Sequence, residues 1–195
     1  MHQKPEGPVF SSQLVQRIYY QDQGYEREKK LSYKSLPYEA VCWGWPAFFP
    51  DTRMDKLYIF SSRYRTNGDF RHLDAENAFI VTTFSLPAIT QKNITLNPED
   101  IKDQFSVGYD AEITQGGTLH NGHIIYSFGY GQEDYPNKIR IISLQERAIT
   151  KKINLSESIF SLEEIEAVDV YNDQLMCNTN AGGVFSLGNI SNFIP

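Results

Sequence analysis

Acidic and amide side chains begin three short hydrophobic segments that resemble one another. Glu39, Gln115 and Glu166 align when these segments are superposed. Further carboxylates lie nearby in the sequence: Asp110, Glu112 and Glu164. Such a group can bind a cation, or act as an acid/base pair if two carboxyl groups stand ~5–9 Å apart. The alternative, which we expect more often, is that these side chains cap and hydrogen-bond strand ends.

Arginines alternate with aromatic residues in a second candidate site, residues 63–72. Arg63, Arg65 and Arg71 can hold a carboxylate or phosphate through paired hydrogen bonds, or stack on a sugar. The alternative is a solvated loop whose arginines pair with neighbouring acids, an arrangement that is common on surfaces and carries little information.

A run of large apolar residues, residues 43–49, forms a third candidate. It contains Trp43 and Trp45 and lengthens the segment between Val41 and Leu57 relative to the matching stretch after Glu166. Exposed, it would offer an aromatic platform to a glycan or a protein. We expect burial instead, because large aromatic side chains mostly serve as core.

Metal and cofactor chemistry finds little support. His120 and His123 flank Asn121-Gly122 as a cross-strand pair, but a zinc site needs three or four protein ligands. Cys42 and Cys177 are expected to be small buried hydrophobes. Nucleophile-elbow, zinc-protease, phosphate-loop and dinucleotide-binding motifs are all absent. We therefore predict no metal and no cofactor.

Composition favours one globular, strand-rich domain. The chain has 195 residues, of which 41% are hydrophobic and 13% aromatic. Its net charge of −6 argues against nucleic acid as a partner. The longest apolar stretch, residues 40–49, is about half of the ~20 residues that a membrane helix needs. No signal peptide is apparent in this sequence, so the compartment stays open, including an extracytoplasmic one if the chain is a fragment.

An internal repeat organises these elements. Ala-Ile-Thr occurs at residues 88–90 and 148–150, and each copy follows a hydrophobic run that ends in Ser-Leu. Glu-Ala-Val occurs at residues 39–41 and again at 166–168. Matched landmarks in matching order indicate a repeated unit.

The unit is predicted to contain four strands. In the clearest copy these are residues 113–119, 124–128, 138–144 and 148–155, with an Asn-Gly hairpin turn at 121–122. The following copy gives 166–170, 175–179 and 184–187, and the preceding copy gives 39–41, 57–61, 78–86 and 89–96. Two more strands are expected at 14–20 and 29–33, and short helical turns at 97–100 and 156–158.

Four-stranded units at this spacing resemble the blades of bacterial β-propeller proteins, over about residues 14–187. The resemblance implies a single all-β domain, an arc of about three blades: a partial unit at 10–36, blades at 37–97 and 98–156, and a partial unit at 157–188. It also places the long loops, 62–77, 97–110, 129–137 and 156–165, on one rim and the tight turns on the other. A β-sandwich is the structural alternative.

These expectations favour a non-catalytic module that binds a small polar ligand, a glycan or a protein on its long-loop rim. The rival is a carbohydrate-active enzyme of the glycoside hydrolase or lyase type, with the inner-strand carboxylates as acid and base. An open arc would leave apolar end faces. We therefore expect either self-association or further blades on the N-terminal side in a longer protein.

Overall fold

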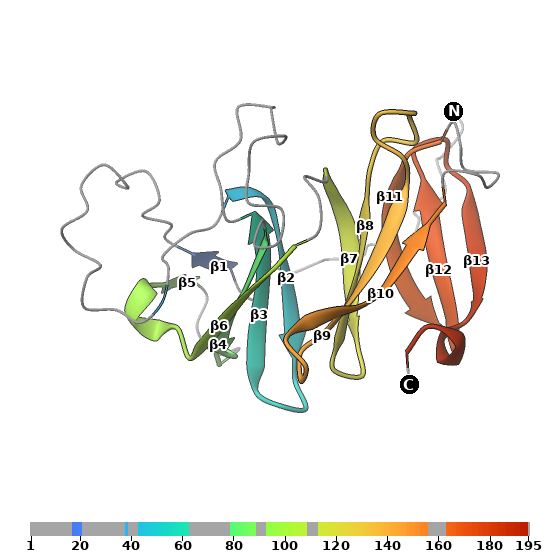
Figure 1. Cartoon of the computed structure of the whole chain (residues 1–195). Helices are drawn as coiled ribbons and strands as arrows, with labels where there is room; N and C mark the ends of the chain where they lie inside the picture. Colours follow the sequence, from blue (N-terminus) through green and yellow to red (C-terminus); the bar gives the residue numbers. More distant parts are fainter. Residues whose placement is uncertain are drawn as a thin grey trace, which may run out of the picture.

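The protein is all-β in its computed structural model, with three antiparallel sheets in a row (Figure 1). The structure describes residues 17–20, 38, 43–62, 79–88, 93–108, 113–155 and 163–194, without the side chains of 17–20, 43–45 and 93. Within these ranges no helix is long and apolar enough to cross a membrane.

The middle sheet follows the predicted four-stranded unit closely. It contains β7 (Thr114–His120), β8 (His123–Phe128), β9 (Lys138–Ser143) and β10 (Ala148–Asn154), in the spatial order β10-β9-β8-β7. Asn121 and Gly122 both have positive φ, at 43° and 72°, which is the backbone that a two-residue hairpin turn requires. His120 therefore pairs directly with His123.

The third sheet also confirms its three predicted strands, β11 (Ile165–Tyr171), β12 (Gln174–Thr179) and β13 (Val184–Asn189). Leu175 and Cys177 of β12 point into the core. The opposite face carries the alternate residues of the three strands: Asp169, Tyr171, Gln174, Met176, Asn178, Val184 and Ser186. This end face mixes polar residues with Tyr171 and Val184, each 69% exposed, so it is apolar only in part.

The first sheet departs from the prediction at both of its edges. It contains β2 (Trp43–Asp51), β3 (Lys56–Ser62), β4 (Phe79–Ser85) and β6 (Asp103–Val107). The apolar run, expected to be an insert, is itself the first strand of this sheet, and the strand expected at residues 39–41 lies outside the described residues. Phe49 is buried, whereas Phe48, on the other face of the strand, is 38% exposed.

The predicted place of residues 89–96 as the fourth strand of this sheet is also wrong. In the described part of this segment, Asn93–Leu96 (β5) is a strand, but it pairs in parallel with β1 (Arg17–Tyr20), and residues 89–92 lie outside the described residues. The edge of the sheet is taken by β6, from the segment that was expected to open the next unit. Between β5 and β6, Pro98–Asp100 forms one 3-10 turn, η3, closed by reciprocal bonds between Asn97 and Asp100.

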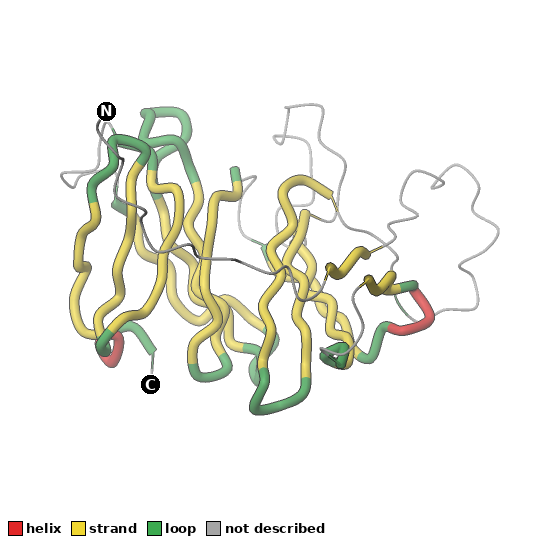
Figure 2. Tube along the Cα trace, turned by 180° about the vertical axis from the view of Figure 1, so that it is seen from behind, coloured by secondary structure: helices red, strands yellow, loops and turns green. Residues whose placement is uncertain are grey.

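A second 3-10 turn, η4 (Ile190–Asn192), follows β13, so η3 and η4 lie at opposite ends of the row of sheets (Figure 2). Asn189 caps η4, because its side-chain oxygen accepts a hydrogen bond from the amide of Ser191 at 2.9 Å. Ile190 and Ile194 then close the lower end of the core between the second and third sheets. No repeat landmark predicts this segment.

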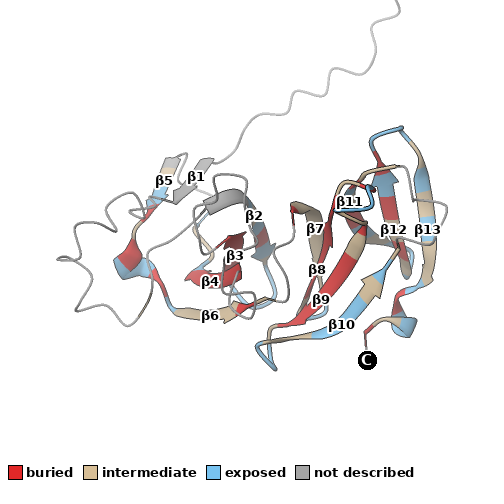
Figure 3. Ribbon diagram, turned by 45° about the horizontal axis from the view of Figure 1, so that its top comes forward, coloured by how far each residue is buried: buried red, intermediate tan, exposed pale blue. Residues whose placement is uncertain are grey.

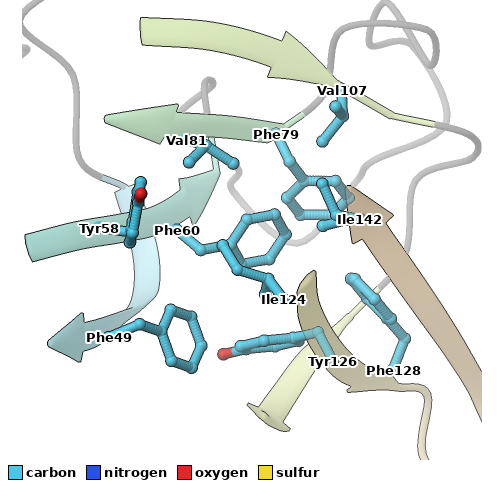
Figure 4. Packing of buried hydrophobic residues seen from close by; sticks show 10 residues of the cluster. All are labelled: Phe49, Tyr58, Phe60, Phe79, Val81, Val107, Ile124, Tyr126, Phe128 and Ile142. Carbon is cyan, nitrogen blue, oxygen red and sulfur yellow. The ribbon is translucent and has the colours of Figure 1, made fainter. Parts of the chain in front are cut away.

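The sheets pack face to face, with their buried residues gathered between them (Figure 3). Strand β7 contacts both β2 and β11, so the first strands of the three sheets are neighbours. Between the first and second sheets lies an aromatic cluster whose members are shown in Figure 4: Phe49, Tyr58, Phe60, Phe79, Val81, Val107, Ile124, Tyr126, Phe128 and Ile142. Phe60 lies at its centre, 4.8 Å from Tyr126 and 5.3 Å from Phe79 between ring centroids.

Two cations join neighbouring sheets at their outer edges. The guanidinium of Arg147 donates to both carboxylate oxygens of Asp103 at 3.0 Å and lies 5.1 Å from the ring centroid of Phe105. The ammonium of Lys151 donates to the carbonyl of Asn192 and lies 5.2 Å from the ring centroid of Phe193. A cation that combines a hydrogen bond with an aromatic contact thus bridges the first sheet to the second, and another bridges the second to the third.

The β7–β8 turn makes the first prediction. Replacing Asn121 with alanine should lower the free energy of unfolding by about 1 kcal/mol, because alanine disfavours positive φ. Asn121→Gly, which accepts that backbone, should stay within about 0.5 kcal/mol of the parent. Gly122→Ala should behave like Asn121→Ala, since its added Cβ would meet nothing within 4 Å and only the φ of 72° opposes it. Urea denaturation measures all three; equal stability of Asn121→Ala and Asn121→Gly would contradict the assigned turn.

The buried thiol and phenol make the second prediction. Burial raises the pKa of Cys177 from 9.0 to about 11 and that of Tyr126 from 10.0 to about 12. Above pH 9 the unfolded chain therefore loses protons that the folded chain keeps, so stability should be full below pH 9 and fall as the pH rises toward these folded values.

Urea denaturation as a function of pH tests this dependence. Cys177→Ala should remove the part of the decline that begins near the ordinary thiol pKa of 9.0, whatever its effect on absolute stability. An identical slope in the parent and the variant would overturn the assignment.

Candidate functional site

The described loops separate into two ends of the molecule. The tight turns that join β2 to β3, β7 to β8 and β9 to β10 lie at one end, and the loop between β8 and β9 lies at the other (Figure 1). We call the latter end the long-loop rim. Of the loops expected there, most of 62–77, the end of 97–110 and most of 156–165 fall outside the described residues.

The loop of residues 129–137 folds back on itself and presents two tyrosines. The amide of Tyr130 donates to the carbonyl of Tyr135 at 2.8 Å, and the amide of Tyr135 donates to the carbonyl of Gln132 at 3.1 Å. The rings of Tyr130 and Tyr135 meet edge to face, with centroids 6.1 Å apart. Both tyrosines are partly exposed, and the three residues at the loop tip are exposed.

Gly131 lets this loop approach the third sheet. It has a φ of 68°, and a Cβ at this position would collide with the carbonyl of Glu163. Only glycine combines that backbone with so close an approach. The loop is therefore held against the chain just before β11.

Asn137 anchors the other end of the loop and is 1% exposed. Its side-chain amide donates to the carbonyl of Glu163, and its side-chain oxygen accepts from the amide of Ile165 at 3.3 Å. Its own carbonyl accepts from the amide of Leu155 at 2.9 Å. One buried side chain thus ties the loop to the start of β11.

The carboxylates at this end are held by neutral donors. The hydroxyl of Thr179 donates to Glu163 Oε2 at 2.7 Å. The side-chain amide of Gln115 donates to Glu164 Oε1 and, at 2.8 Å, to the carbonyl of Gly129. Both acids therefore join β7, β11 and β12 at their ends, which is the structural alternative raised from the sequence.

The structure describes some of the other predicted site residues and leaves the rest outside its described ranges. Glu166 is an exposed residue of β11, and Trp43 and Trp45 belong to β2, where only their backbone is described. The remaining candidates lie outside the described residues: Glu39, Arg63, Arg65, Arg71, Asp110 and Glu112. Across the parts of the chain that are described, no three His, Cys, Asp or Glu side chains gather closely enough to hold a metal ion.

The histidine pair lies at the opposite end, on the tight turn. His123 Nδ1 lies 2.9 Å from the carbonyl of Asn121, so one ring nitrogen is used within the hairpin. Cys177 is buried in the core between the second and third sheets, as expected. Cys42 is not among the described residues.

Comparison with known proteins adds no family. No protein-family model matches the chain, and no curated protein matches it either. Its function is therefore argued from the geometry of the long-loop rim.

Three residues of this rim escaped the sequence reasoning: Tyr130, Tyr135 and Asn137. The signal was present in part, because Gly129 and Gly131 frame the first tyrosine and mark a shaped turn. Nothing in the sequence shows that Asn137 is buried, since asparagine is more often a surface turn residue.

Asn137 makes the third prediction. Asn137→Ala should lower the free energy of unfolding by about 2 kcal/mol, because it leaves a buried amide and a buried carbonyl without partners. Asn137→Asp should be similarly destabilising, because it places an oxygen against the carbonyl of Glu163. Gln132→Ala at the exposed tip should stay within about 0.5 kcal/mol of the parent. Thermal and urea denaturation measure this series, and a neutral Asn137→Asp would contradict the donor role.

Proposed function

We propose that the protein is a non-catalytic binding module whose ligand site lies on the long-loop rim, with Tyr130 and Tyr135 among the contact residues. The carrying observation is that this loop is rigidly anchored and yet presents two partly exposed rings. Rigid aromatic side chains give contact area at low entropic cost. A glycan or a peptide fits this surface, since both bind to aromatic rings flanked by polar groups.

The state of the acids supports binding over hydrolysis. A glycoside-cleaving pair needs two carboxyl groups facing a substrate across ~5–9 Å. Glu163 and Glu164 instead accept hydrogen bonds from Thr179 and Gln115 and join strand ends. No specific observation favours the enzyme, so we advance a single function.

The finer architecture belongs to the same proposal. We infer an arc of β-propeller blades from three features: the strands of each sheet are antiparallel and follow one another in chain order, the first strands are neighbours, and apolar faces fill the space between sheets. In such an arc one rim gathers the loops between the second and third strands. In this proposal the arginine-rich loop of residues 63–72, which lies outside the described residues, belongs to the same rim as residues 129–137.

The fourth prediction tests the site by ligand screening. A glycan array and a thermal-shift screen of metabolites and short peptides should yield a ligand whose affinity falls about tenfold or more in Tyr130→Ala and Tyr135→Ala. Tyr171→Ala is the matched control, because Tyr171 is 69% exposed on the third sheet, away from this loop. It should leave the affinity unchanged.

The arginine loop is tested in the same assay. Arg63→Ala, Arg65→Ala and Arg71→Ala should weaken an anionic ligand, whereas a His120→Ala/His123→Ala pair at the other end should not. Loss of binding only in the histidine pair, or equal loss in Tyr171→Ala and Tyr135→Ala, would overturn the rim site.

A further inference from the structure

The loop that carries the proposed site also carries acidic side chains. Glu133 and Asp134 stand between Tyr130 and Tyr135 in the chain, and both acids are exposed. Residues 129–137 contain no Lys, Arg or His. The tip of the loop therefore places two negative charges within a few residues of both rings.

Two further carboxylates belong to the segment against which this loop is held. The side-chain amide of Gln115 donates to the carbonyl of Gly129 at 2.8 Å and also to Glu164 Oε1. The backbone of Gly131 lies so close to the carbonyl of Glu163 that a Cβ would collide with it. Because these two glycines flank the first tyrosine of the loop, both glutamates belong to the surroundings of that ring.

No described residue forms a salt bridge with any of these four carboxylates. The hydroxyl of Thr179 and the amide of Gln115, which bind the two glutamates, are neutral donors. Residues 163–183 contain no Lys, Arg or His, and Lys138, at the start of β9, can offset one of the four charges at most. The described part of this end is therefore electronegative, which favours a positively charged ligand.

The tyrosine pair offers a cation a second kind of contact. A tyrosine ring face attracts an ammonium or guanidinium group that lies within ~6 Å of the ring centroid. Tyr130 and Tyr135 meet edge to face, so ring faces remain that the partner ring does not cover. A neutral glycan would use the rings without the charges, and an anionic ligand would be repelled by the four carboxylates. Rings and acids together thus select an organic cation.

The exposure of the site favours a side chain presented by a protein over a free small molecule. Pockets for small ligands bury most of the ligand surface. Tyr130 and Tyr135 are instead partly exposed, and the loop tip between them is exposed. A protein segment adds contacts through the residues on either side of its charged side chain, so it can bind to a surface of this kind.

We propose that the long-loop rim binds a protein segment through a lysine or arginine side chain, whose charged group lies over Tyr130 or Tyr135 and beside the carboxylates of the loop. The inference rests on the proposed function, because it assigns a ligand class to the same site. An anionic ligand held by the arginine-rich loop of residues 63–72 is the competing outcome of the experiment.

The fifth prediction uses NMR titration of the full chain with blocked pentapeptides of the sequence Gly-Ser-X-Ser-Gly. With lysine or arginine at X, the backbone amides of Tyr130 and Tyr135 should shift in a saturable way, and binding should weaken as salt is raised. With glutamate at X, or with norleucine, which keeps the alkyl chain without the charge, these shifts should be absent. N-acetyl-arginine amide should bind more weakly than the arginine peptide, because it lacks the flanking residues.

Variants separate the contribution of the rings from that of the charges. Tyr130→Leu and Tyr135→Leu should each weaken the lysine and arginine peptides about threefold or more, whereas Tyr130→Phe and Tyr135→Phe keep the ring and should retain binding. Glu133→Gln combined with Asp134→Asn should also weaken both peptides about threefold or more, because it removes two negative charges without changing the shape of the loop.

Asp169→Asn combined with Asp173→Asn is the matched control. It also removes two exposed charges, one from the outer face of the third sheet and one from the turn between β11 and β12, away from the loop. Binding of the lysine and arginine peptides should stay unchanged. Equal losses in the control and in the loop variant would overturn the inference.

The inference and the proposed function fail in different ways. Absence of binding by the lysine and arginine peptides, or equal binding of the norleucine peptide, would overturn the organic cation alone. The same holds for a screened ligand that Arg65→Ala weakens and the Glu133→Gln/Asp134→Asn variant does not. Unchanged binding of every ligand in the Tyr130 and Tyr135 variants would overturn the rim site itself.

Discussion

The fold depends on the alternation of side chains along β8. Ile124, Tyr126 and Phe128 point toward the first sheet, and Ile125 points toward the third. Both faces of this strand are buried, so each side-chain position must suit one of two different cores. A one-residue slip would send the aromatic rings into the aliphatic core and isoleucine into the aromatic one. The register of β8 therefore fixes how all three sheets pack.

The outer edges of the sheets carry a different kind of interaction. Arg147 and Lys151 fill this role by combining a bond to a backbone carbonyl with a ring contact across the gap. Half-exposed ion pairs alone are worth little. Because the charged group of each side chain also lies over an aromatic ring, it helps to orient one sheet relative to the next.

The sequence predicted the second and third sheets well because their turns are encoded locally. Asn121-Gly122 and Asn172-Asp173 adopt positive φ. Each turn lies between segments in which apolar and polar residues alternate or apolar residues are continuous. Pairing partners are not encoded locally. The likeness of residues 88–96 to 148–155 led to the wrong edge strand, since an Ile-Thr pattern suits any strand, antiparallel beside β4 or parallel beside β1.

The candidate site shows the same division between local and tertiary information. The acids near β11 were found from their positions, but their roles depend on Gln115 and Thr179, which lie on other strands. Gly131 has no Cβ, so its loop can approach Glu163 closely, and Asn137 is then buried against the same residue. This contact joins a loop of the second sheet to the chain just before the third. Contacts between residues far apart in the chain produce no spacing pattern in the sequence, so sequence analysis could not predict them.

The outer face of the third sheet makes the end of the row different from the two interfaces inside it. Asp169, Gln174, Asn178 and Ser186 lie on this face beside Tyr171, Met176 and Val184. Stacking another sheet there would bury the polar groups without partners. Terminal units of repeat proteins carry polar residues on their outer faces for the same reason. The polar residues of this face therefore disfavour growth of the row by stacking on the third sheet.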